Sequence, residues 1–179
     1  MTEFGGSSWL LGGATRDQQS ITSDWQSSPQ NFIDGVRVKE VTNVCTSYGI
    51  LTEIYRSDWV LDGLGVDQVF RASLAPGRFS AWHAHEHTTD RLFVIEGIVL
   101  TVLYDGRPDS PTRGMINEFR TGALRPTLIR VPPKVWHGIQ NISIEQATVL
   151  NLVDRAYQYE APDHWRLPPD SPEIPYQFC

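Results

Sequence analysis

Short hydrophobic runs separated by turn-forming residues dominate the chain from about residue 32 onward. The runs are rich in β-branched and aromatic side chains, and Gly, Pro, Asn or Asp bounds each of them, which is typical of β-strands joined by turns. No stretch shows the periodicity of a long amphipathic helix. The pattern predicts an all-β antiparallel sandwich or small barrel, with strands at 36–41, 50–55, 69–74, 92–104, 128–131, 139–142 and 147–153. Residues 108–125 are predicted to form a long connection.

The two ends of the chain differ from this central part. Residues 1–31 are rich in Gly, Ser, Thr, Gln and Asp and lack helical or strand periodicity, so we expect an irregular arm, or one that a neighbouring subunit orders in part. The tail from Tyr157 is rich in Pro and aromatic residues and is predicted to lie extended on the barrel. The sequence therefore predicts an irregular N-terminal arm at 1–31 and a single domain at 32–179.

Composition narrows the range of partners and compartments. The 179 residues include 15 Lys and Arg against 21 Asp and Glu, a formal charge of −6, and the basic residues are scattered, which argues against nucleic acid as the main partner. No apolar run approaches the roughly 20 residues that span a bilayer, and the N-terminus does not look like a signal peptide. The cysteines, Cys45 and Cys179, are too few for a disulfide framework. We expect a soluble, cytoplasmic protein with a small-molecule substrate and no membrane partner.

Three of the five histidines stand at the alternate positions His83, His85 and His87. Because successive side chains of a β-strand point to opposite faces, three such imidazoles on one strand would point the same way. Imidazole is the commonest metal-binding side chain and titrates near neutral pH. The spacing indicates a metal site or a pH-sensitive pocket, and the alternative for any one of these histidines is a hydrogen-bonded interior residue.

The surroundings of these histidines resemble the two motifs of the cupin family. The first motif is followed by Gly77, His83, His85, Asp90 and Gly97, and the second by Pro132, Lys134, His137 and Asn141. The chain departs from the pattern at Asp90, where the family usually has Glu, and at Lys134, where Gly is usual.

The cupin resemblance implies a double-stranded β-helix, or jelly-roll barrel, with a metal site inside. The implied ligands of a divalent ion are His83, His85, Asp90 and His137, and Mn, Fe, Co, Ni or Zn would suit this set of side chains. An alternative for Asp90 is a surface ion pair with the adjacent arginine. His87 falls at no motif position, and we expect it beside the ion or at the rim of the pocket.

A second resemblance runs in order along most of the chain. Its segments are 33–38, 48–59, 91–97, 109–112, 129–138, 157–162 and 170–174. They look like the dTDP-4-dehydrorhamnose 3,5-epimerase family, which is itself a cupin-type jelly roll. The resemblance implies a homodimer that acts on nucleotide-linked 4-keto-6-deoxy sugars without a metal. Such chemistry removes a proton beside a ketone and returns it on the other face, which needs a base, a group that orients it and a stabiliser of the enolate.

Carried over residue by residue, this resemblance assigns four roles. It places His83 on the proton-abstracting base, Asp170 at or next to its carboxylate partner, Arg91 on a basic residue near the keto oxygen, and Glu53 on an acid that contacts the nucleotide.

The chain also departs from the epimerase pattern. Ser80 and Tyr48 stand where the family has arginines, so bidentate anion contacts are lost. Asn151 stands where the general-acid tyrosine is expected. Tyr157 or Tyr159 is a possible replacement, although a structural role in the tail is the alternative.

We therefore interpret the chain as an epimerase-like cupin whose pocket is built around an ion that polarises the ketone. The candidate proton-transfer residues are His83, Asp170 and His87, and the candidate substrate-binding residues are Glu53, Arg91, Trp82, Trp136 and Lys134. Two other classes stay open. One is a metal-dependent cupin enzyme of another kind, such as a dioxygenase or lyase, and the other is a non-catalytic cupin that binds a ligand.

Overall fold

The computed structural model describes residues 9–26, 28–59 and 63–179, and these residues contain β-strands but no α-helix. The strands are β1 (Arg37–Glu40), β2 (Asn43–Thr46), β3 (Gly49–Thr52), β4 (Gln68–Leu74), β5 (Phe79–Ala84), β6 (Asp90–Glu96), β7 (Ile98–Tyr104), β8 (Ile116–Gly122), β9 (Thr127–Val131), β10 (Trp136–Asn141), β11 (Ala147–Val153) and β12 (Trp165–Arg166). The described part accordingly has no helix long and apolar enough to cross a membrane. The chain divides into the units Met1–Asn31 and Phe32–Cys179.

The first unit contains no named strand among its described residues, and residues 1–8 of the predicted arm lie outside them. Local hydrogen bonds shape the rest. The backbone nitrogen of Gln26 donates to Oγ1 of Thr22 at 3.1 Å, and that of Ser28 donates to the carbonyl of Ser20 at 2.9 Å. Trp9 and Trp25 are exposed, so this unit buries little apolar surface of its own.

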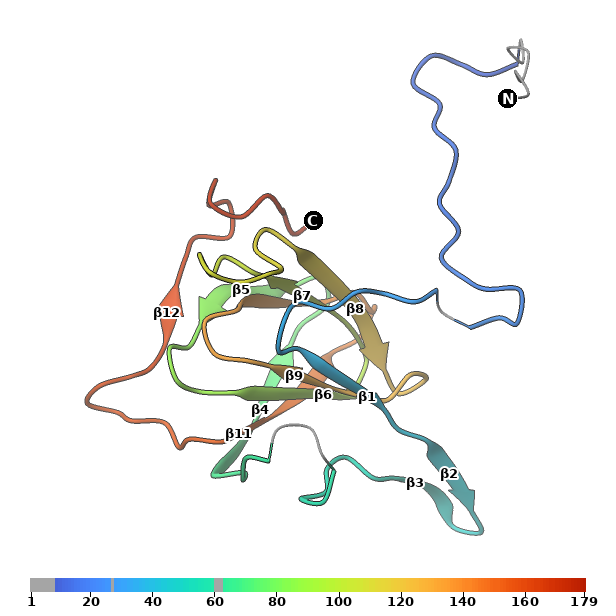
Figure 1. Cartoon of the computed structure of the whole chain (residues 1–179). Helices are drawn as coiled ribbons and strands as arrows, with labels where there is room; N and C mark the ends of the chain where they lie inside the picture. Colours follow the sequence, from blue (N-terminus) through green and yellow to red (C-terminus); the bar gives the residue numbers. More distant parts are fainter. Residues whose placement is uncertain (1–8, 27, 60–62) are drawn as a thin grey trace. The chain divides into compact units, whose positions relative to one another are not determined.

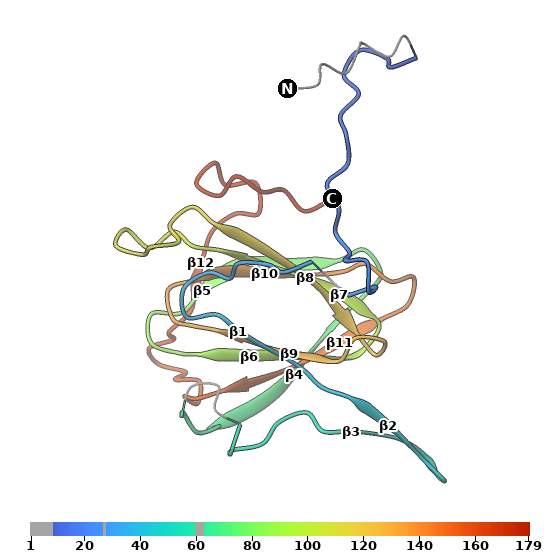
Figure 2. The same ribbon diagram turned by 45° about the vertical axis from the view of Figure 1, so that its right-hand side comes forward.

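Two five-stranded antiparallel sheets form the second unit. One sheet has the order β1-β9-β6-β11-β4 and the other the order β12-β5-β10-β7-β8, and they lie as two layers in Figure 2. A separate hairpin of β2 and β3 extends beyond the first sheet (Figure 1). Strands far apart in the chain, such as β6 and β11, are neighbours in each sheet, as in a jelly roll. The predicted all-β jelly-roll fold is confirmed.

The main hydrophobic core lies between the two sheets. Both sheets contribute to it: β6 and β9 bury Leu92 and Ile129, while β7 and β10 bury Val99 and Ile139. Burying each such side chain fully stabilises the fold by about 1.5–3 kcal/mol.

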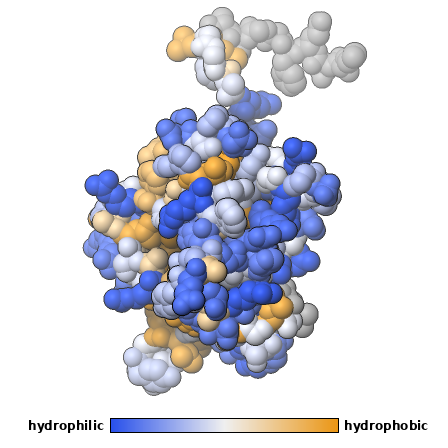
Figure 3. Space-filling model, turned by 90° about the vertical axis from the view of Figure 1, so that its left-hand side faces the viewer, coloured by the Kyte–Doolittle hydropathy of each residue, from blue (hydrophilic) through white to orange (hydrophobic). Residues whose placement is uncertain are grey.

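The outer faces of the sheets are covered as well. On one sheet, Ile174 and Phe178 of the tail pack against Trp82. On the other, Ile54, Tyr55 and Trp59 pack against the cluster that contains Phe93. Strands buried on both faces need apolar side chains at successive positions, which explains the continuous hydrophobic runs of β6 and β7. The face that carries β12 is largely hydrophilic, with hydrophobic residues showing between the polar ones (Figure 3).

The structure refines one predicted segment and corrects another. The hydrophobic run at 92–104 forms two strands that turn at Gly97, where φ is 74°. A Cβ at this position would lie 2.7 Å from Cβ of Ala147, so both the turn and the packing require glycine. The connection predicted at 108–125 contains β8, which pairs along its length with β7. It escaped detection because its buried positions include the polar Asn117 and Thr121, which do not read as hydrophobic alternation.

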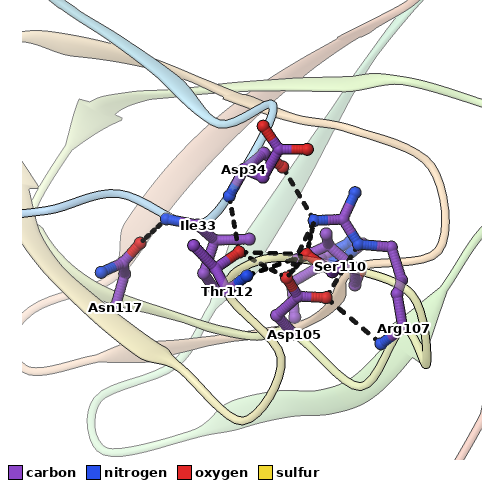
Figure 4. Close-up of polar contacts among 9 residues, drawn as sticks. Ile33, Asp34, Asp105, Arg107, Ser110, Thr112 and Asn117 are labelled. Carbon is purple, nitrogen blue, oxygen red and sulfur yellow. Dashed lines mark hydrogen bonds and ion pairs between the residues drawn. The ribbon is translucent and has the colours of Figure 1, made fainter.

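A buried carboxylate fixes the loop that joins β7 to β8 (Figure 4). Asp105 is fully buried and accepts hydrogen bonds from Nε of Arg107 at 2.8 Å, from the hydroxyl of Ser110 at 2.5 Å and from that of Thr112 at 2.6 Å. The loop in turn holds the entry to β1, since the backbone nitrogen of Asp34 donates to Oγ1 of Thr112 at 2.8 Å. These bonds hold the pKa of Asp105 well below its usual range, against the opposing effect of burial.

Candidate active site

A cavity of about 950 Å³ lies between the sheets of the second unit. Its wall is formed by side chains of β4, β5 and β11 and by the tail segment 155–166. The volume is in the range of small-molecule sites in proteins. Apolar residues such as Phe70 and Val149 share the wall with histidines and arginines, so the cavity combines apolar surface with positioned polar groups.

Four histidines and one aspartate meet beside this cavity, and all of them except the buried His137 line it. His83 lies on β5 and faces His137 across the pairing with β10, with ring centroids 4.1 Å apart. His85 follows β5, and His164 precedes β12, which pairs with β5. The ring of His164 lies 5.4 Å from that of His83 and 5.0 Å from that of His85. Asp90 opens β6 in the facing sheet, so both sheets contribute to the cluster.

Asp90 is the centre of the cluster. Its Oδ2 lies 3.2 Å from Nε2 of His85 and 3.1 Å from Nε2 of His137. Its Oδ1 accepts a hydrogen bond of 2.7 Å from the side-chain nitrogen of Asn151. Burial opposes ionisation of this carboxyl group, but the contacts with His137 and His85 outweigh it and hold the pKa of Asp90 well below its usual range. Asp90 is therefore a carboxylate at neutral pH.

The histidines of the cluster differ in their protonation. Burial, reinforced by the neighbouring His137, holds the pKa of His83 well below its usual value. Burial and the nearby His85 lower the pKa of His164 in the same way. Burial also disfavours a charge on His85, but its contact with Asp90 prevails and raises its pKa. The rings of His83 and His164 are thus neutral at pH 7, while His85 holds a positive charge more readily.

Asp163 fixes the loop that carries His85. Its carboxylate accepts backbone hydrogen bonds from Glu86 at 2.6 Å, His87 at 2.9 Å and Thr88 at 3.0 Å. Its carbonyl accepts a hydrogen bond from Nδ1 of His85. The tail segment before β12 therefore orients one histidine of the cluster and supplies another, His164.

The structure brings together the four residues predicted as metal ligands, His83, His85, Asp90 and His137, and of these only His85 lies outside a strand. His87 also lines the cavity, but its side chain is 61% exposed and its Nε2 lies 4.0 Å from Glu86. The three alternate histidines do not share one strand, because β5 ends at Ala84.

Two residues predicted to bind substrate point away from the cavity. Arg91 is buried on the other face of β6, where its guanidinium donates to the carbonyls of Leu152 and Leu64. Trp82 is fully buried beneath the tail, next to Phe178. Each is the sequence neighbour of a cluster residue, and neighbours on a strand face opposite ways. The role that the resemblance gave to Arg91 therefore falls one position away from the residue that faces the cavity, Asp90.

The other predicted residues also lie outside the cavity lining. Glu53 is exposed and pairs with Arg56 at 3.2 Å. Trp136 packs in the cluster beneath the tail, and Lys134 is exposed. Asp170 is exposed on a turn and makes no side-chain hydrogen bond or ion pair with the described residues.

Sequence reasoning missed three groups in or around the site. His164 and Asp163 come from the tail, whose place beside β5 no local pattern reveals. Asn151 was interpreted as a loss of tyrosine, whereas its amide holds Asp90. A signal for His164 was present, because the chain has only five histidines and this one stands near neither motif in the sequence.

A jelly roll whose cavity between the sheets carries a buried histidine cluster is the architecture of a cupin-type binding or enzyme site. The sequence matches no profile of a known protein family. It is similar to the probable low-salt glycan biosynthesis epimerase Agl13 of Haloferax volcanii, with 33% identity over 139 residues, which cover 77% of this chain and 89% of that protein. It is also similar to the spore coat polysaccharide biosynthesis protein SpsL of Bacillus subtilis, with 31% identity over 148 residues, 82% of this chain and 97% of that one.

A solved structure adds to these relatives. The dTDP sugar isomerase of Desulfovibrio desulfuricans G20 superposes with a TM-score of 0.76 at 28% identity, over 82% of this chain and 92% of that one. The chain therefore belongs to the family of sugar epimerases and isomerases that resemble dTDP-4-dehydrorhamnose 3,5-epimerase. The predicted enzyme class is confirmed with the family. The predicted metal ion and the roles of individual residues stay predictions.

Proposed function

We propose that this enzyme epimerises a nucleotide-linked 4-keto-6-deoxy sugar by removing the proton beside the ketone and returning it on the opposite face. The observation that carries the proposal is the position of His83 in the cavity wall. The ring lines the cavity, and its Nδ1 is shut off from solvent without a hydrogen-bond partner among the described residues, which leaves Nε2 as the nitrogen that can face a substrate. A general base must offer an unoccupied nitrogen within hydrogen-bond reach of the proton that it takes, and His83 meets this requirement.

The neighbours of His83 hold its ring in place. His137 packs edge-on against it at 4.1 Å, and His164 lies on the other side at 5.4 Å with a 30° angle between the rings. A base that is held by packing does not have to be ordered when the substrate binds. We assign His164 a positioning role beside His83, the place that the family resemblance gives to Asp170.

Three arginines support a charged ligand. Arg78, Arg155 and Arg166 line the cavity, and no side-chain hydrogen bond or ion pair to another described residue is formed by any of them. Guanidinium groups bind phosphate oxygens with two parallel hydrogen bonds. These arginines would take the part of the two that the family has at the positions of Ser80 and Tyr48, and would hold the diphosphate of a nucleotide sugar.

Two tyrosines support the second proton transfer. Tyr157 and Tyr159 line the cavity, with ring centroids 5.2 Å apart. Asn151 is occupied by Asp90 and by the backbone nitrogen of Arg91, so it is not free to donate to a substrate. A tail tyrosine would provide the hydroxyl donor, or the aromatic wall against which the sugar or base lies.

We also propose that the enzyme is a cytoplasmic homodimer. The β2–β3 hairpin exposes Val44, Tyr48, Ile50 and Leu51, an apolar surface that a second copy would cover. Glu53 follows this hairpin and lies outside its own chain's cavity lining, so a nucleotide contact by this residue requires the pocket of a partner. Light scattering should give twice the 20.2 kDa of one chain, and the mass of a single chain would contradict the proposal.

The proposed function is tested by product analysis. The purified enzyme is incubated with dTDP-4-keto-6-deoxyglucose, and the configuration of the sugar carbons beside the ketone is read by proton NMR. Inversion at one or both carbons is expected. Unchanged substrate across a panel of nucleotide-linked keto sugars, with a protein that is folded by circular dichroism, would contradict the proposal.

A further inference from the structure

Three donor atoms of the histidine cluster converge beside the cavity, where two of the three residues, His85 and Asp90, line the wall. They belong to His85, Asp90 and His137 and all lie within 4.8 Å of one another. Oδ2 of Asp90 is 3.2 Å and 3.1 Å from the two Nε2 atoms. Two ligand atoms, each about 2.1 Å from one metal ion, are about 3.0 Å apart at a right angle and about 3.4 Å apart at a tetrahedral angle. The observed separations fall within this interval.

In both His85 and His137, the ring nitrogen Nδ1 already has a hydrogen-bond partner. Nδ1 of His85 contacts the carbonyl oxygen of Asp163, and Nδ1 of His137 lies 3.0 Å from the carbonyl oxygen of Val135. A carbonyl oxygen only accepts, so each Nδ1 carries a hydrogen, and the neutral ring then has a lone pair on Nε2. Metal-binding histidines are oriented in this way, with the distal N–H donated to a carbonyl.

The contacts of Asp90 with these rings do not have the geometry of hydrogen bonds. Although both Nε2 atoms are close, Oδ2 is a buried oxygen without a hydrogen-bond partner among the described residues. The Nε2 atoms are therefore aimed beside the oxygen and not at it. Ligands around a common ion are arranged like this, because each lone pair points at the ion.

The far side of the carboxylate is also fixed. Asn151 donates to Oδ1 of Asp90 at 2.7 Å and accepts from the backbone nitrogen of Arg91 at 3.2 Å. This amide leaves Oδ2 as the atom that faces the two histidines. Asn151 thus acts as a positioning residue for Asp90, which gives a physical reason for an amide at this position.

We infer that His85, Asp90 and His137 bind one divalent transition-metal ion in the wall of the cavity, with His83 outside the ligand set. Two imidazoles and one carboxylate suit Fe, Mn, Co, Ni or Zn and leave positions open toward the cavity. Such an ion, when bound, would supply Lewis-acid polarisation of a substrate oxygen. The inference goes beyond the proposed function, and it removes the conflict in which His83 is both a ligand and a base.

The inference is tested with the full-length protein and cobalt(II) as the probe. Protein is stripped with a chelator, dialysed and titrated with CoCl₂, with binding followed by calorimetry and visible absorption. We expect one ion per chain. Asp90→Asn and His85→Ala should each weaken binding about a hundred-fold or more, and Asn151→Leu about 10–100-fold. His87→Ala and His83→Asn should bind as the wild type does.

Circular dichroism identifies any variant that fails to fold, and the remaining ones carry the test. Less than a tenth of an ion per folded wild-type chain at millimolar cobalt would overturn the inference. So would wild-type affinity in both Asp90→Asn and His85→Ala, or an equal loss in His83→Asn, which would make that ring a ligand. Binding without epimerase activity would count against the proposed function alone, and activity without binding against the ion alone.

Discussion

Removing the carboxylate of Asp105 should destabilise the fold strongly. Asp105 has no exposed surface and accepts hydrogen bonds from Arg107, Ser110 and Thr112 at 2.5–2.9 Å. Breaking a buried charged pair by deleting one partner costs about 3–5 kcal/mol, and here Arg107, Ser110 and Thr112 would all lose the acceptor that they share. For a domain of this length that corresponds to a fall in Tm of about 6–20 °C. We therefore expect Asp105→Ala to lower Tm by that amount.

The pH dependence of this effect has a definite sign. The folded-state pKa of Asp105 is lowered, so its contribution is fully present above the unfolded value of about 3.9. It is lost progressively as pH falls below that value toward the folded pKa. The difference in unfolding free energy between the wild type and Asp105→Asn should shrink by about 1 kcal/mol between pH 6 and pH 3.

Urea unfolding at several pH values measures both quantities. Asp109→Asn is the matched control, because Asp109 is exposed in the same loop and its substitution should change stability by less than about 0.5 kcal/mol. A loss below about 1 kcal/mol for Asp105→Ala at pH 7 would refute the assignment of Asp105 as the buried anchor of the loop.

Two further predictions concern the site. Asp163→Ala removes the acceptor of three backbone N–H groups and of the Thr88 hydroxyl. Hydrogen exchange at the backbone of residues 86–88 should therefore become faster, and kcat should fall. Unchanged exchange at these residues would contradict the anchoring role of Asp163. Arg155→Gln should raise KM for a nucleotide sugar about 10-fold, the value of one lost charge-assisted hydrogen bond, with kcat little changed. An unaltered KM would exclude this arginine from ligand binding.

The fold was predictable because its signal is local. Hydrophobic runs bounded by turn residues located most strands, and the two motifs located the histidine pair, the aspartate and His137. β8 was missed because a strand whose buried positions include Asn117 and Thr121 lacks the alternation that periodicity detects. In this case the partner strand β7 decides the conformation.

The site was predictable only in part because several of its residues depend on tertiary contacts. His164 and Asp163 reach the cluster through the pairing of β12 with β5, which involves two residues in a tail without strand periodicity. Arg91, from the resemblance, and Trp82, as an aromatic residue next to His83, were predicted to bind substrate, but the alternation of faces along β6 and β5 turns them away from the cavity. A shift of one residue in an alignment matters little for assigning the family, but on a strand it moves the assigned side chain to the opposite face of the sheet.

The central claim is that His83 moves the proton beside the ketone. The most direct test is solvent exchange: the enzyme is incubated with dTDP-4-keto-6-deoxyglucose in D₂O, and deuterium at the carbons next to the ketone is followed by NMR and mass spectrometry. The wild type and Asp109→Asn should incorporate deuterium at the same rate, and His83→Asn should be about 10²–10⁴-fold slower while keeping its fold. Equal incorporation by His83→Asn, or epimerisation by the wild type without deuterium, would contradict the account.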